Sequence, residues 1–381
     1  MSSDAKQRAA DRIARLAGRG LDLVSFWRES TEVLARAVPH YWAPCWFTMD
    51  PASLLVTSHF DEGIPELPPE WLMHEYYQDD VNKLVDVARS KRGISTLHEA
   101  TGGDPTSSPR WHLNITLGGD QELIAALRTQ AGEVWGALGL YRAPGQPLFD
   151  DAELAFVQAI APSLAEGARR ALLVGEAVDP EGPDAPGLVV LSVQGEVESA
   201  TPGVERWLQA LPDGDWDAGK LPSSVRAVAG RALRTAEHPD EPGQVAVSRV
   251  LSRSGTWVVL HGTSLIASGT RRIAVIVEPA HPARIAPLLM SVYELTEREQ
   301  DVTRLVLQGS STADIADRLV VSAHTVQQHL KSVFDKTGVR SRRDLVGKVF
   351  FSHYEPRVRD NEHRAAQDQP LRGGPFTHGA T

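Results

Sequence analysis

The 381-residue chain contains a single cysteine, Cys45. One cysteine can form neither an intramolecular disulfide nor a cysteine-rich zinc site, and this favours a reducing, intracellular setting. The sequence has no run of about 18 apolar residues that could cross a membrane. Its N-terminal segment is polar and charged, unlike a signal peptide. We therefore expect a soluble, cytoplasmic protein with no membrane span.

Motifs of enzymes and of cofactor or metal sites are also missing. The chain has no nucleophile elbow, no metal motif and no G-x-x-x-x-G-K-[ST] phosphate loop. Asp79 and Asp80 form a carboxylate pair, but acidic side chains in loops are usually only solvated. Four metal-ligating side chains of the N-terminal region lack the i, i+3 or i, i+4 spacing of a helical site: His40, Cys45, His59 and His74. The sequence thus predicts a protein that is not an enzyme and binds no metal or cofactor.

Positive charge is in deficit, with 39 Lys and Arg against 49 Asp and Glu and a net charge of -10. Such a chain is not expected to coat nucleic acid non-specifically, although a local basic face is compatible with it. Hydrophobic residues make up 42% and charged residues 23%, as in ordinary globular proteins. The length leaves room for roughly two or three domains.

Proline- and glycine-rich stretches divide the chain into segments and predict a multidomain α+β protein. Residues 176–187 (EAVDPEGPDAPG) carry three prolines, two glycines and four acids and are typical of a linker. The polar segment 354–381 is predicted to be a disordered tail. Three folded segments are expected between these bounds: 21–175, 188–284 and 285–353.

The first two segments mix helices and strands. In the first, we expect a helix over 26–38, a strand over 134–141 and a helix that starts at Asp150. Asp150 and Glu153 have the spacing of a capping box. In the second, a β-rich run broken by Gly195 precedes two short helices and two strands, which together predict a small α+β domain: helices 204–211 and 223–234, strands 256–261 and 273–277.

The third segment is predicted to be purely helical. Three S/T-x-x-D/E pairs mark helix starts, Ser322 supplies a fourth N-cap hydroxyl, and two glycines mark helix ends. Apolar residues recur at helical spacing between these signals. Four short helices with one apolar stripe each are stable only when packed together. The signals are Thr296–Glu299, Ser311–Asp314, Ser341–Asp344, Gly309 and Gly338.

Packing of these helices would leave one polar face of the third helix exposed. Glutamine can pair with adenine and lysine with guanine in the major groove. From Arg318 to Phe350, seven basic residues stand against two acidic ones, a net +5, whereas Glu294 to Asp317 carries -4. Such a basic side suits phosphate contact. The candidate DNA-binding residues are His324, Thr325, Gln327, Gln328, Lys331, Lys336, Arg340, Arg342 and Arg343.

This segment resembles the LuxR-type DNA-binding domain over about 60 residues. The matching strings are L-T-x-R-E at 295–299, I-A-x-x-L at 315–319, S-x-x-T-V-x-x-H-L at 322–330 and K-x-G-V-x-S-R at 336–342. The resemblance implies that the second helix of the pair enters the major groove, with base-reading positions at Gln327, Gln328 and Lys331. Relatives often have lysine at the first of these, so glutamine suggests a different operator. Sigma factors share L-T-x-R-E but lack T-V-x-x-H-L.

The end of the first segment, 133–173, resembles the last strand and closing helix of a GAF domain, an antiparallel sheet with helices on one face and a ligand cavity on the other. The second segment faintly resembles a PAS domain. Apolar and polar side chains suited to line a ligand pocket are Tyr41, Trp46, Trp71, Tyr77, Trp111 and His112, for which a structural core role is the alternative.

We therefore expect a one-component, sequence-specific transcriptional regulator that binds a double-stranded DNA operator as a homodimer, since pairing doubles a short helix's contact. The candidate dimer surfaces are the helix 151–173 and the last helix, 342–350. A small-molecule effector and contact with RNA polymerase fit this reading. The alternative is a scaffold, or a sigma-factor-like protein, that uses the helical bundle for protein contacts.

Overall fold

The computed structural model describes residues 3–62, 71–172, 186–241, 245–267, 269–280, 290, 293–307, 310–342 and 345. The chain forms two compact units, one made of 1–175, 186–253 and 258–278, the other mainly of 279–381. Most of the expected linker, the tail 354–381 and nearly all of the last predicted helix lie outside the described residues, as do Gly309 and Arg343.

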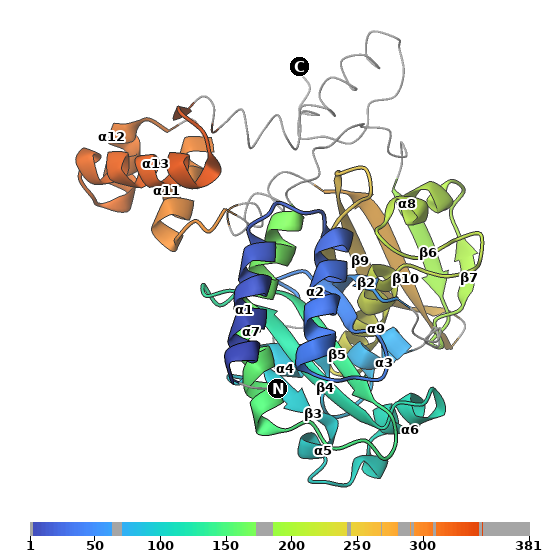
Figure 1. Ribbon diagram of the computed structural model, residues 1–381. Helices are drawn as coiled ribbons and strands as arrows, with labels where there is room; N and C mark the ends of the chain where they lie inside the picture. Colours follow the sequence, from blue (N-terminus) through green and yellow to red (C-terminus); the bar gives the residue numbers. More distant parts are fainter. Residues whose placement is uncertain are drawn as a thin grey trace. The chain divides into compact units, whose positions relative to one another are not determined.

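The first unit begins with an antiparallel sheet whose strand order is β2-β1-β5-β4-β3. Three helices cover one face of this sheet (Figure 1). Its strands are β1 (Cys45–Met49), β2 (Val56–Phe60), β3 (Ile94–Thr96), β4 (Gln121–Arg128) and β5 (Val134–Arg142); the helices are α1 (Ser3–Ala17), α2 (Leu23–Ala37) and α7 (Asp151–Ala171). The expected strand near 134–141 and helix after Asp150 are present, whereas α1 precedes residue 21, where the first domain was expected to begin.

The core beneath these helices is built from alternate residues of the strands. Leu123, Ala125 and Leu127 of β4 belong to it, whereas Ile124 and Ala126 belong to the core on the opposite face, as the two-residue period of a strand requires. Tryptophan stacking joins the layers, since Trp27 of α2 and Trp46 of β1 have ring centroids 4.5 Å apart. Asp150 and Glu153 complete a reciprocal capping box at the start of α7, as the sequence predicted.

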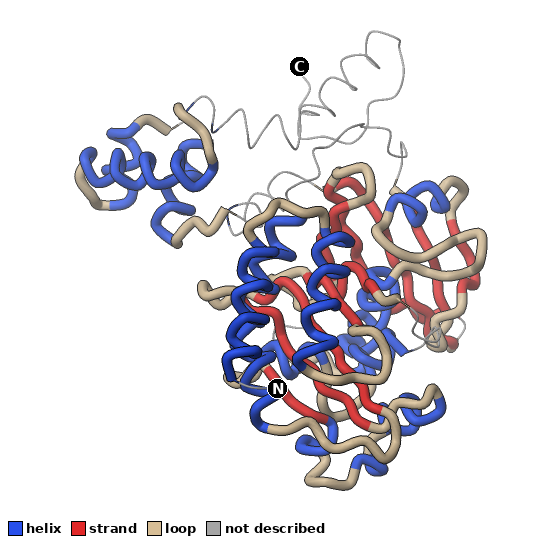
Figure 2. Tube along the Cα trace, viewed as in Figure 1, coloured by secondary structure: helices blue, strands red, loops and turns tan. Residues whose placement is uncertain are grey.

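A second five-stranded sheet follows, with the order β7-β6-β10-β9-β8. Counted within each sheet, the strand order is therefore the same in both. The strands of both sheets are drawn in red in Figure 2. The elements are β6 (Gly187–Leu191), β7 (Val197–Ala200), β8 (Val247–Leu251), β9 (Trp257–Ala267), β10 (Thr270–Pro279), α8 (Val204–Ala210) and α9 (Ser223–Glu237). The expected helices and strands are found, Gly195 turns the chain with φ 85°, and β8 is an addition. Gly187, expected to end the linker, already pairs with Val277.

Short helices lie between β2 and β4 in the sequence. They are α3 (Trp71–Tyr77), α4 (Leu84–Arg89), α5 (Leu97–Ala100), the 3₁₀ helix η1 (Pro105–Ser107) and α6 (Pro109–Thr116). Helix α3 packs against α9, and one hydrophobic core contains residues from both sheet regions. The two segments expected as separate domains therefore belong to one compact unit.

The edge strands β2 and β8 also lie near each other. Each edge has a backbone N–H that bonds to a carboxylate of the other region. His59 N donates to Asp213 at 2.8 Å, and Arg249 N donates to Asp50 at 2.9 Å. The Arg249 guanidinium adds a contact of 2.5 Å to the same carboxylate, so this junction is fixed by side chains.

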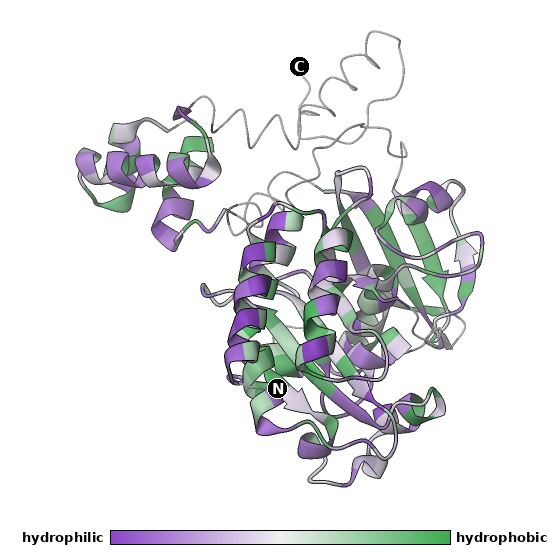
Figure 3. Ribbon diagram, viewed as in Figure 1, coloured by the Kyte–Doolittle hydropathy of each residue, from purple (hydrophilic) through white to green (hydrophobic). Residues whose placement is uncertain are grey.

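The second unit contains α11 (Glu297–Leu307), α12 (Thr312–Leu319) and α13 (Ala323–Thr337), which pack on one another. Its helices carry hydrophilic residues along with apolar ones (Figure 3). The expected capping pairs form at Thr296–Glu299 and Ser311–Asp314. The third expected capping pair, Ser341–Asp344, includes Asp344, which lies outside the described residues. The mixed α+β fold with a helical C-terminal region agrees with the prediction.

Candidate functional site

Helix α13 starts and ends at residues suited to these positions. The Ser322 hydroxyl accepts a hydrogen bond of 3.0 Å from Thr325 N, which satisfies one of the free N–H groups of the first turn. Gly338 ends the helix with φ 67°, a left-handed conformation that glycine adopts without strain. These two signals fix the length of α13 and therefore which residues share its faces.

The two faces of α13 differ sharply in chemistry. Val326, Leu330 and Val333 are buried against the other helices. Polar residues lie between them on the outer side and are exposed: His324, Gln327, Gln328 and Lys331. We call these four residues the polar face of α13. Within it, Gln328 Nε2 lies 3.2 Å from His324 Nε2, so hydrogen-bonding groups stand on the surface of the unit.

A buried carboxylate holds α13 to α11. Glu299 of α11 is 5% exposed and accepts from Lys336 Nζ at 2.6 Å and from Ser332 Oγ at 2.6 Å. Burial alone would raise the pKa of Glu299. The hydrogen bonds from Lys336, Ser332 and Thr296 N outweigh burial and lower the pKa to about 2. The carboxylate is therefore charged and paired at neutral pH, and it orients α13 relative to α11.

The basic residues expected to contact phosphate differ in their surroundings. Lys336 is engaged by Glu299 and by the backbone oxygen of Glu294, at 2.9 Å. Arg342 donates to the backbone oxygen of Ser310. Arg340 and Lys331 are exposed, whereas Arg343 lies outside the described residues. Thr325, also expected at the interface, is half-buried and takes part in the N-terminal cap.

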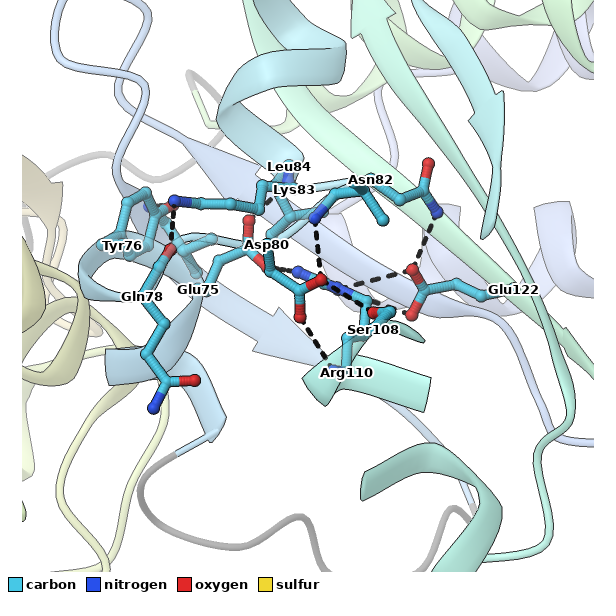
Figure 4. Close-up of polar contacts among 12 residues, drawn as sticks. Glu75, Tyr76, Gln78, Asp80, Asn82, Lys83, Leu84, Ser108, Arg110 and Glu122 are labelled. Atoms are coloured by element: carbon cyan, nitrogen blue, oxygen red, sulfur yellow. Dashed lines mark hydrogen bonds and ion pairs between the residues drawn. The ribbon is translucent and has the colours of Figure 1, made fainter. Parts of the chain in front are cut away.

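A second candidate site is a buried charged cluster in the first unit (Figure 4). Arg110 of α6 lies between two carboxylates whose side chains are 0% exposed, Glu75 of α3 and Glu122 of β4. It contacts Glu122 at 3.4 Å and makes a short ion pair with Glu75. The amides of Asn82 and Asn114 donate to Glu122 at 2.8 and 2.9 Å. We call these five residues the Arg110 cluster.

Backbone groups complete the surroundings of the cluster. Leu84 N donates to Glu75 at 2.5 Å, and Asp80 accepts from Ser108 Oγ at 2.7 Å and from Arg110 N at 2.8 Å. Burial raises the pKa of Glu75, while Arg110 and the Leu84 N–H oppose that shift. Arg110 Nε and Asn82 Oδ1 are buried without a hydrogen-bond partner among the described residues. The cluster thus retains hydrogen-bonding capacity, which is unusual for buried polar groups.

The aromatic residues suggested for a ligand pocket are not brought together as one set. Trp71 lies near the Arg110 cluster, with the guanidinium 5.5 Å from its ring, whereas Trp46 lies in the core beneath the helices. Tyr41 is 60% exposed, and Tyr77 hydrogen bonds to Glu237 of α9. Half-buried Trp111 donates to Asp120 at 2.9 Å and meets the ring of exposed His112 edge-on at 5.3 Å.

Sequence reasoning missed the Arg110 cluster. Its members come from three separate stretches of the chain, and only Glu122, before the apolar run 123–127, hinted that a charge would be buried. Within the described part of the chain, no group of three or more His, Cys, Asp or Glu is arranged to hold a metal ion. The described helices also include none that is long and apolar enough to cross a membrane.

Two solved structures show distant similarity to the chain. A bacteriophytochrome from the photosynthetic bacterium R. palustris is 13% identical with a TM-score of 0.28, covering 73% of this chain and 63% of that one. The E. coli DhaR(N)–DhaL complex is 13% identical with a TM-score of 0.21, covering 73% and 89%. TM-scores this low do not establish a shared fold.

The C-terminal region has much closer relatives. Over 55 residues, 14% of the chain, it is 56% identical to proteins of Mycobacterium bovis and Mycobacterium tuberculosis that are named as HTH-type transcriptional regulators. The match spans only 6% of the length of these relatives. Residues 293–349 match the family described as bacterial regulatory proteins, luxR family. The similarity expected from the motifs is confirmed: this segment is a LuxR-type helix-turn-helix domain.

Proposed function

We propose that the chain is a sequence-specific, DNA-binding transcriptional regulator that inserts α13 into the major groove. The observation that carries the proposal is the polar face of α13, which is exposed while the opposite face is buried. A single α-helix fits the major groove of B-DNA. Helix α13 follows α12 within the residues that match the luxR family, and the second helix of a helix-turn-helix pair reads bases, which supports the proposal.

Roles within this surface follow from side-chain chemistry and from the contacts already made. Gln327 and Gln328 suit the donor and acceptor pair of adenine, and Lys331 suits the acceptors of guanine. Exposed Arg340 is assigned to phosphate, together with Arg343. Lys336 and Arg342 carry charge near phosphate while they also hold the domain together, so their replacement affects stability as well as affinity.

The first unit is proposed to sense a signal for the DNA-binding domain. Its two sheets have one strand order, which supports a GAF-like region followed by a related, PAS-like region. The Arg110 cluster, with hydrogen-bonding capacity left in its core, supports a small polar effector for the GAF-like region. Binding as a homodimer to a palindromic operator, with contact to RNA polymerase, completes the proposal.

Binding of labelled DNA fragments, selected from genomic DNA with the full chain, tests the function. Lys331→Ala and Gln328→Ala should each weaken binding by about 1–3 kcal/mol and relax base preference. Arg304→Ala, which removes the same charge from the exposed face of α11, is the matched control and should leave base preference unchanged. Affinity should also fall steeply between about 50 and 200 mM salt.

The scaffold and sigma-factor-like alternatives predict a different result. A bundle that binds only proteins would select no DNA and show no steep salt dependence, because few counterions would be released. Equal affinity of the wild type, Lys331→Ala and Gln328→Ala for the selected fragments would refute the assignment of α13 as the reading helix.

A further inference from the structure

Helix α9 is enclosed on two sides in the first unit. On one side it packs on its own sheet, where a Cβ added at Gly262 would lie 2.7 Å from Val228. On the other side it packs on α3, where a Cβ at Gly230 would lie 2.5 Å from the backbone oxygen of Met73. The contact with α3 therefore buries side chains of α9 between the two sheet regions.

Arg231 lies on that side of α9 and is only 1% exposed. Its guanidinium lies 5.3 Å from the centre of the Tyr76 ring of α3. The side-chain atoms Nε and Nη1 are buried and have no hydrogen-bond partner among the described residues. Aromatic contact compensates a buried cation only in part, and an unpaired buried charge is costly.

The guanidinium of the neighbouring Arg234, at the same contact, has partners for its N–H donors. It pairs with Glu241 at 2.5 Å, with Asp79 at 2.8 Å and with the backbone oxygen of Tyr77 at 3.0 Å. Burial lowers the pKa of Arg231, and the charges of Arg89 and Arg234 add to this, against Tyr76 and Asp86. Arg231 therefore keeps free donors in a buried position, whereas the donors of Arg234 are paired.

We propose that Arg231 is the anchor of an effector site between α3 and α9, which takes a small molecule with a carboxylate or phosphate group. The planar fork of a guanidinium offers paired N–H donors that match such anions. Since Arg231 is sealed, an anion reaches it only by parting α9 from α3, so binding changes the contact between the two sheet regions. This site is separate from the Arg110 cluster; the proposal gives the proposed sensor an anionic effector at a second place and rests on that role.

Thermal unfolding followed by tryptophan fluorescence tests the site in the full chain. Acetate, benzoate and inorganic phosphate are each compared with chloride at equal ionic strength. This comparison shows whether the site binds a carboxylate or a phosphate group. At about 100 times Kd, an anion that binds should raise Tm by about 5 °C or more. The variant Arg231→Met should lose this shift while its own Tm stays equal or rises, since the unpaired charge is removed.

Arg234→Met is the matched control, because it removes the same charge from a paired neighbour. It should lower Tm and keep the anion response. If Arg231→Met does not fold, Arg231→Lys keeps the charge but loses the fork, and the anion should then bind at least tenfold more weakly. An equal anion response in the wild type and the Arg231 variant, or no response beyond chloride, overturns the proposal. DNA affinity without anions is measured in parallel and is expected to be unchanged in Arg231→Met, so failure of the anion site leaves DNA binding standing.

Discussion

Replacing Glu299 by glutamine should loosen the LuxR-type domain without altering the polar face of α13. The carboxylate is 5% exposed and has a pKa of about 2 instead of 4.5. Since one pKa unit corresponds to about 1.4 kcal/mol, its charged form contributes on the order of 3 kcal/mol to folding of the domain. Glutamine retains an acceptor for Ser332 but loses the ion pair with Lys336, so we expect a loss of about 2–3 kcal/mol.

Hydrogen exchange measured by mass spectrometry is a suitable assay. All nine tryptophans precede residue 258, so intrinsic fluorescence does not report on this domain. A loss of about 2–3 kcal/mol should speed exchange in peptides from 323–337 by roughly 30- to 150-fold. Asp301→Asn is the control: this half-buried carboxylate on the same helix pairs with exposed Arg304 at 2.8 Å, and its loss should cost at most about 0.5–1 kcal/mol.

The pH dependence provides a second measurement of the same carboxylate. Because its pKa is lower in the folded than in the unfolded domain, the contribution is fully present above about pH 4.5 and is lost as the pH falls towards 2. Glu299→Gln should lack this contribution and lose less stability over this range than the wild type; Asp314, whose pKa is also lowered by Ser311, remains in both. Exchange in 323–337 that changes less than about threefold at neutral pH would refute the role given to this ion pair.

Three further substitutions test the first unit by thermal unfolding. Arg110→Met leaves two buried carboxylates unpaired and should cost about 3–5 kcal/mol. Gly230→Ala should cost about 1–3 kcal/mol, because the added methyl meets the backbone of Met73. Arg249→Ala removes the ion pair and the two guanidinium hydrogen bonds to the buried carboxylate of Asp50, leaves the backbone donor in place, and should cost about 2–4 kcal/mol.

Matched controls accompany these three variants. Gly18→Ala adds a methyl whose nearest neighbour is 3.6 Å away, and Arg12→Ala breaks an exposed pair with Glu32 at 3.4 Å. Both should change stability by at most about 0.5–1 kcal/mol. Test variants as stable as these controls would show that the contacts contribute little.

Local signals in the sequence predicted local structure well. Ser322, Gly338 and the Asp150–Glu153 pair act within one helical turn, so their spacing alone indicated where helices begin and end. Contacts between residues distant in the sequence could not be predicted from local patterns. No pattern near Arg110 indicates Glu75 or Glu122 as its partners, and none in β8 indicates that it lies next to β2. Lys336 illustrates the limit, since its type and position suggested phosphate, while its partner Glu299 depends on how two helices pack.

The carboxylates at the junction of β2 and β8 have a consequence for movement. Two paired strands carry matching rows of amides and carbonyls, and once pulled apart they can rejoin shifted by two residues. Here Asp213 and Asp50 each accept a hydrogen bond from one backbone amide. The described residues of β2 and β8 belong to different sheets and are not paired with each other. These two carboxylate contacts therefore hold the two strand edges in one alignment.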